Sequence, residues 1–85
     1  MPIKHKFEKT LTACARLAIG KSTYYNHIEN GTLPPLISIG ERSVAVLEYE
    51  TTEIISAIAA GATQSEIKAL VVTLVKNRQN LLEVK

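Results

Sequence analysis

The sequence predicts a mainly α domain with a small β-hairpin, arranged as a winged helix-turn-helix with a C-terminal helix. Three observations support this fold class. Two short helical patterns are separated by residues 18–20, two β-prone runs flank a Gly-x-Arg turn, and a long apolar helical stripe occupies the carboxyl end. A chain of 85 residues suffices for one small domain, and a hydrophobic content of 46% suffices for its core.

The first two helices are predicted over residues 10–17 and 21–30. We expect Thr10 to cap the first helix and Gly20 to break the chain in the turn between them. Gly31 is expected to end the second helix in the left-handed conformation, and Pro34 and Pro35 prevent its continuation. Small and apolar residues recur at helical spacing along the first pattern: Leu11, Cys14, Ala15 and Ala18.

A β-hairpin is predicted next, from the runs 36–39 and 43–47. Gly40, Glu41 and Arg42 lie between the runs, and a glycine at the first turn position suits a type II′ turn because it supplies the positive φ. Strands this short need helices to pack against. A hairpin directly after a helix-turn-helix is a wing.

Two further helices are expected over residues 50–60 and 65–82. Gly61 is expected to end the first of them, and Thr63 with Glu66 fits a capping box for the second. The chain is thus divided into a winged DNA-binding unit, residues 1–62, and a helical extension, residues 63–85, within one compact unit. The last helix carries a wide apolar stripe: Ile67, Leu70, Val71, Leu74, Val75 and Leu82.

The last helix raises two alternatives. A winged helix is already closed by its third helix, so exposed aliphatic surface on a fourth helix predicts a partner. The simplest partner is a second copy, held through Leu70, Leu74 and Val75. In the other alternative, the helix folds onto its own domain and completes a small core.

The second helix carries the candidate recognition surface. On a helical wheel, Tyr24 and Ile28 point toward the core, with His27 beside them. Hydroxyl and amide groups on the opposite face can hydrogen-bond base edges in a major groove, and asparagine suits adenine. An ordinary solvated helix face is the alternative. The outer face is polar and almost uncharged: Ser22, Thr23 and Asn26, flanked by Tyr25 and Glu29.

The charge distribution favours a polyanion partner. The net charge is +2, with six basic and three acidic residues in 1–47 (+3) and four basic and five acidic in 48–85 (−1). Lys21, Tyr25 and Arg42 are placed to hold phosphates, and Arg42 could instead enter a minor groove. A basic amino-terminal arm is either frayed or in contact with DNA: Lys4, His5, Lys6 and Lys9.

Enzymes, cofactors and metal sites are not expected. Cys14 lies on an apolar helical stripe, which favours a core position over a nucleophile. His5 and His27 have no partners at metal-ligand spacing. A single cysteine excludes an internal disulfide and favours a reducing compartment, and no apolar run is long enough to cross a membrane. We therefore expect a cytoplasmic protein, which would be associated with the nucleoid if its polyanion partner is DNA.

Three stretches carry a family resemblance: residues 21–25 (KSTYY), 29–35 (ENGTLPP) and 40–44 (GERSV). In this order they resemble the AlpA-like regulators of prophages, relatives of phage excisionases and of MerR-type winged helices. The chain departs from that pattern at Ala18, where the turn often has glycine, at Gly20, where serine is usual, and near Val46, where a tryptophan is often found.

The resemblance implies sequence-specific binding of double-stranded DNA. Such proteins regulate promoters of a prophage or mobile element, or bend attachment-site DNA so that an integrase excises the element. The alternative function is a protein-interaction module that acts through its C-terminal helix without specific DNA binding. The residues expected to touch DNA are Lys21, Ser22, Thr23, Tyr25, Asn26, Arg42 and Ser43.

Overall fold

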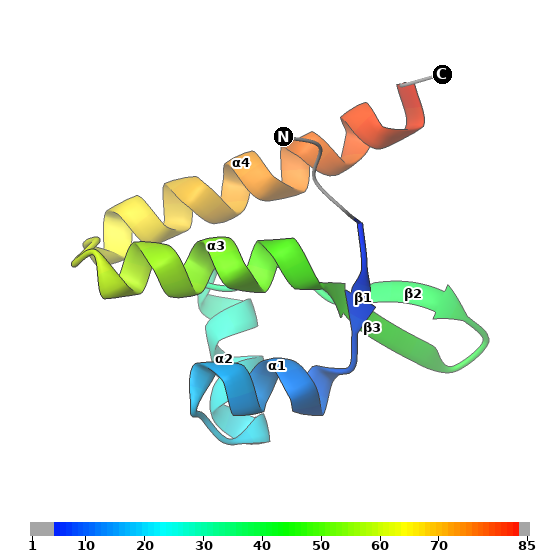
Figure 1. Ribbon diagram of the computed structural model, residues 1–85, viewed down its shortest axis with the longest axis horizontal. Coiled ribbons are helices and arrows are strands. Elements are labelled where there is room, and N and C mark those ends of the chain that lie inside the picture. Colours follow the sequence, from blue (N-terminus) through cyan, green and yellow to red (C-terminus); the bar gives the residue numbers. More distant parts are fainter. Residues whose placement is uncertain (1–4, 84–85) are drawn as a thin grey trace.

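Four helices and three short strands make up the computed structural model, which describes residues 5–83. Helix α3 runs between α4 on one side and α1 with α2 on the other, and the β2–β3 hairpin extends away from the helices (Figure 1). This architecture confirms the predicted fold class. The elements are β1 (Phe7–Glu8), α1 (Thr10–Leu17), α2 (Lys21–Asn30), β2 (Ile37–Gly40), β3 (Ser43–Leu47), α3 (Glu48–Ala59) and α4 (Gln64–Glu83).

The helix ends are set by local signals that the sequence shows only in part. The capping box is confirmed, because the Thr63 N–H donates to Glu66 Oε1 at 2.8 Å and the Glu66 N–H donates to Thr63 Oγ1 at 3.2 Å. Thr10 is not the cap of α1: Lys9 holds that position and makes no side-chain capping bond. The chain enters α1 directly from β1, so Thr10 is already helical.

Strand β1 was not predicted. It pairs antiparallel with β3, with Phe7 opposite Leu47, and gives a three-stranded sheet in the order β1-β3-β2. The Glu48 N–H also donates to the Lys6 carbonyl at 2.7 Å, where α3 begins. The amino-terminal arm is therefore partly ordered by pairing with the wing strand. Lys4 lies outside the described residues.

In the turn between α1 and α2, the left-handed residue is Ala18, whereas Gly20 was expected to break the chain there. Ala18 takes the left-handed conformation (φ 59°), and its N–H donates to the Ala15 carbonyl at 3.1 Å. Gly20 is extended (φ −80°) and serves as the N-cap of α2. Gly31 (φ 82°) is the left-handed C-cap of α2, as predicted. The C-cap of α3 is Ala60 and not the predicted Gly61, which is left-handed (φ 88°) one residue later.

The wing turn differs from the predicted type II′ turn. Gly40 does not have a positive φ, whereas Arg42 does (φ 60°). The register between β2 and β3 is irregular between Ser38 and Gly40, which leaves Ile39 in a bulge. An extra residue in one strand shifts the left-handed position to the last residue of the loop, a common form of longer hairpin.

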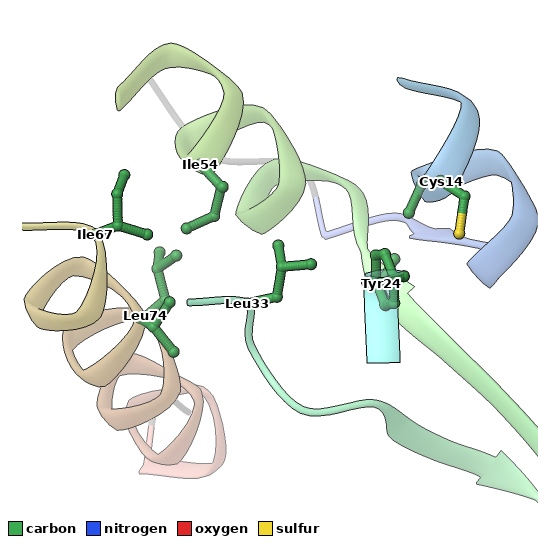
Figure 2. Close-up of a cluster of buried hydrophobic side chains, with 9 residues drawn as sticks. Cys14, Tyr24, Leu33, Ile54, Ile67 and Leu74 are labelled. Carbon is green, nitrogen blue, oxygen red and sulfur yellow. The ribbon is translucent and has the colours of Figure 1, made fainter. Parts of the chain in front are cut away.

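A continuous core joins all the helices. Leu33, from the segment after α2, lies between Tyr24 of α2 and Leu74 of α4 (Figure 2). On α1 the buried residues are Ala13 and Cys14, while Leu11, which was expected on the inner stripe, is 66% exposed. The buried core cluster consists of Ala13, Cys14, Tyr24, Leu33, Val46, Ile54, Ile67, Val71 and Leu74.

Helix α4 is part of this core and is not surplus to it. Leu74, which was expected on an exposed partner surface, is only 4% exposed, and Leu70 and Val75 are half-buried against the cluster. Arg78 of α4 also forms an ion pair with the buried Glu50 of α3. The structure therefore has the alternative arrangement, in which the helix folds onto its own domain.

Candidate nucleic-acid interface

Helix α2 presents one buried face and one solvent face. Tyr24 is 1% exposed and Ile28 is half-buried, which confirms the inward face predicted from the wheel. The side chains expected to read or hold DNA are all exposed on this helix: Lys21, Ser22, Thr23, Tyr25 and Asn26. Their hydroxyl and amide groups are thus available to an external partner.

The rotation of α2 about its axis is fixed from within the domain. Tyr24 lies in the core, and its ring meets the Tyr25 ring edge-on at a centroid distance of 6.3 Å. Burial raises the pKa of Tyr24 to about 12, with smaller contributions from Cys14 and Glu8, so its phenol is neutral at ordinary pH. A neutral, buried anchor keeps the polar face of α2 turned outward.

The carboxyl end of α2 is held by side-chain hydrogen bonds. His27 Nδ1 lies 2.8 Å from Thr32 Oγ1, and the Thr32 hydroxyl also donates to the His27 carbonyl at 3.2 Å. Gly31 turns the chain in the left-handed conformation between these two residues. His27, beside the core as expected, therefore ties the helix end to the segment that leads to the wing.

The wing places an arginine at its tip. Arg42 is exposed between β2 and β3, and it makes no side-chain hydrogen bond or ion pair with the side chains that the structure describes, residues 5–80. Ser43 is exposed beside it and faces Gly40 across the hairpin. Ile39 and Val44 are also exposed on the wing. The tip thus combines a free cation with small polar and apolar groups.

One basic residue of the amino-terminal half, Arg16, forms an ion pair and hydrogen bonds within the domain. Arg16 Nη1 donates to both carboxylate oxygens of Glu8 at 2.8 and 2.9 Å and to the Glu48 carbonyl at 3.3 Å, while Nη2 donates to Thr52. Arg16 is one of the six basic residues counted in residues 1–47, and this role was not predicted from the sequence because its partners come from β1 and α3. The exposed cations without a side-chain partner in the described part of that half are Lys9, Lys21 and Arg42.

The structure also shows where the cysteine lies and whether possible metal ligands come together. Cys14 is buried in the core, as expected for a packing residue. Among the described side chains, those of residues 5–80, no group of three His, Cys, Asp or Glu residues is placed to hold a metal ion. Over the same residues, no helix is long and apolar enough to cross a membrane.

The family comparison agrees with this arrangement. A family model described as "Prophage CP4-57 regulatory protein (AlpA)" matches residues 9–57, which include α1, α2, the wing and most of α3. No curated protein and no solved structure matches the chain. The matched segment covers more than half of the sequence and contains every candidate DNA-contacting residue. The chain therefore belongs to the AlpA family of prophage regulatory proteins.

Proposed function

We propose that the protein binds a specific site in double-stranded phage or bacterial DNA, with α2 in the major groove and the wing against the backbone or minor groove. The observation that carries this proposal is the solvent face of α2. That face is polar, exposed and almost uncharged, while Tyr24 locks the opposite face into the core. A helix of this kind fits a major groove and can read base edges.

Each of the seven candidate DNA-contacting side chains has a proposed role. Ser22, Thr23 and Asn26 read bases, and asparagine pairs best with the N6 and N7 atoms of adenine. Lys21 and Tyr25 flank them and hold phosphates. At the wing, Arg42 contacts phosphate or a narrow minor groove, with Ser43 beside it.

Within this function we propose that the protein regulates transcription of a prophage or mobile element, or acts as an excisionase-type factor beside an integrase. Both roles use the same DNA-binding surface. The family description, a regulatory protein, favours the first. Mapping the chromosomal sites that the tagged protein occupies separates the two, because promoter sites indicate regulation and attachment sites indicate excision. Either role would place the protein at the nucleoid.

The rival function, a protein-interaction module acting through α4, has less support because the apolar stripe of α4 contributes to the core of its own domain. A second copy is still a proposed partner on DNA, since two units double a site that one small unit reads weakly. That contact would use exposed residues and not Leu74.

Asn26→Ala tests the proposed function. A preferred duplex is first selected with purified protein from a random double-stranded pool, and affinities are then measured by fluorescence anisotropy. We expect the substitution to cost about 1–3 kcal/mol on the selected duplex and to leave binding to an unrelated duplex nearly unchanged. The matched control is Asn77→Ala, at an exposed asparagine of α4, which should bind like the wild type. Equal losses on both duplexes would show that Asn26 does not read a base.

A further inference from the structure

A buried ion pair joins α3 to α4 and extends to the backbone ahead of the wing. Glu50 is 1% exposed. Arg78 Nε donates to Glu50 Oε2 at 2.8 Å, and Arg78 Nη2 donates to Glu50 Oε1 and to the Pro35 carbonyl, the latter at 3.0 Å. One guanidinium therefore links three parts of the domain: α3, α4 and the segment between α2 and β2.

That segment, residues 31–36, is the connection between the recognition helix and the wing, and we call it the linker. Leu33 anchors its first part in the core, next to Tyr24 and Leu74 (Figure 2). Its last part is held by the Arg78 contact at Pro35 and by the half-buried Leu36, directly before β2 begins at Ile37. A side chain from α4 thus contacts the segment that leads from α2 into β2.

We propose that Arg78 is a positioning residue for DNA binding, which sets the wing relative to the recognition helix by holding the Pro35 carbonyl. The inference rests on the proposed function. Arg78 lies outside the segment that matches the family, residues 9–57, so α4 would add a constraint beyond the matched region. A planar guanidinium paired through two nitrogens has little rotational freedom, which makes the third contact well defined.

Stability alone does not account for a charged pair at this site. Apolar residues of similar volume often replace a buried ion pair without loss of stability. Apolar residues would also keep α3 and α4 together, but they cannot donate a hydrogen bond to the Pro35 carbonyl. A hydrogen-bond donor at position 78 is therefore needed to restrain the linker through the Pro35 carbonyl.

A double-mutant cycle between Arg78 and Arg42 tests the proposal. Glu50 and Arg78 are both changed to Met, so that neither charge is left buried without its partner. Arg42→Ala is then made in the wild type and in the Glu50→Met/Arg78→Met background. In the wild type, Arg42→Ala should weaken binding to the selected duplex by about tenfold. In the Glu50→Met/Arg78→Met background, affinity should already be lower, and Arg42→Ala should cost less than about twofold, because a displaced wing has little contact left to lose.

Two measurements distinguish positioning from a merely structural role. Circular dichroism should show that the double variant is folded at the assay temperature. The slope of log affinity against log salt should fall by about one in that variant, the same change that we expect for Arg42→Ala alone. If the double variant does not fold, Arg78→Lys provides the second test: it keeps a positive charge beside Glu50 but loses the fork that reaches Pro35, and the same coupling with Arg42 is expected. Lys76→Ala, at an exposed basic residue of α4, is the control and should show no coupling.

The outcomes separate this inference from the proposed function. Equal costs of Arg42→Ala in both backgrounds, in folded proteins that bind DNA, overturn the positioning role and leave DNA binding intact. A wild-type protein that selects no duplex overturns the proposed function and the inference with it. A coupled loss with a lowered salt slope supports both.

Discussion

At the residue scale, the turn of the helix-turn-helix depends on an unusual backbone conformation. Ala18 adopts φ 59° and ψ 39° at the end of α1, where its N–H and that of Ile19 satisfy the carbonyls of Ala15 and Cys14. This left-handed region penalises a residue with a Cβ atom and favours glycine. The chain therefore carries a local conformational cost at Ala18.

Ala18→Gly should therefore stabilise the protein. We expect a gain of about 0.5–1 kcal/mol in the free energy of unfolding, because glycine adopts this conformation without the Cβ penalty. Urea denaturation followed by circular dichroism measures it. The matched control is Ala15→Gly in the exposed interior of α1, which should instead lose about 0.5–1 kcal/mol. A loss at both positions would contradict the interpretation of Ala18.

The buried Tyr24 phenol should make stability fall at alkaline pH. In the folded protein its pKa is raised to about 12 by burial, while in the unfolded chain it ionises near 10.0. The stabilising difference is fully present below pH 10 and is lost as pH rises toward 12, because the unfolded state releases the proton first. At about 1.4 kcal/mol for each pH unit, the expected loss is about 1.4 kcal/mol at pH 11 and about 2–3 kcal/mol once the pH exceeds the folded pKa.

Urea melts at pH 8 and at pH 11 test this expectation in matched variants. Tyr24→Phe should reduce the difference in stability between the two pH values. Tyr25→Phe, at the neighbouring exposed tyrosine, should keep the wild-type difference. A wild-type difference that persists in Tyr24→Phe would assign the alkaline transition to another group.

At the element scale, the parts that local chemistry determines could be predicted from the sequence. Helices α1 and α2 occupy the predicted ranges. The end of α2 is determined locally, because Gly31 is left-handed and Pro34 and Pro35 follow it. The capping box of α4 is likewise local. The outward face of α2 also followed from sequence, since Tyr24 and Ile28 fix its inner side.

The parts that depend on distant partners could not be predicted. Strand β1 is too short to show an alternating pattern and exists through its pairing with β3. The bulge at Ile39 comes from the register of the hairpin, and it moved the left-handed residue from Gly40 to Arg42. The role of Arg16 was not predicted because its partner, Glu8, lies on that unpredicted strand.

At the scale of the whole molecule, α4 is what distinguishes the fold from a minimal winged helix. Two of its buried residues, Ile67 and Leu74, meet Ile54 and Leu33 across the core (Figure 2). A domain of this size has a small free energy of unfolding, so the apolar area that α4 buries is a large share of the burial that stabilises it. The wide stripe that suggested a partner surface therefore closes the protein's own core.

Leu74→Glu consequently should unfold the domain and not produce a folded monomer. Burying a carboxylate at a 4% exposed core position combines the lost leucine packing with an unpaired charge, which together cost about 3–5 kcal/mol or more. Val72→Glu on the same helix is the matched control, since Val72 is 66% exposed and its substitution should change stability by less than about 0.5 kcal/mol. Thermal melts by circular dichroism measure both, with light scattering at several concentrations to report the mass. A Leu74→Glu protein that stays folded and halves its mass would restore α4 as an oligomerisation surface and remove it from the core.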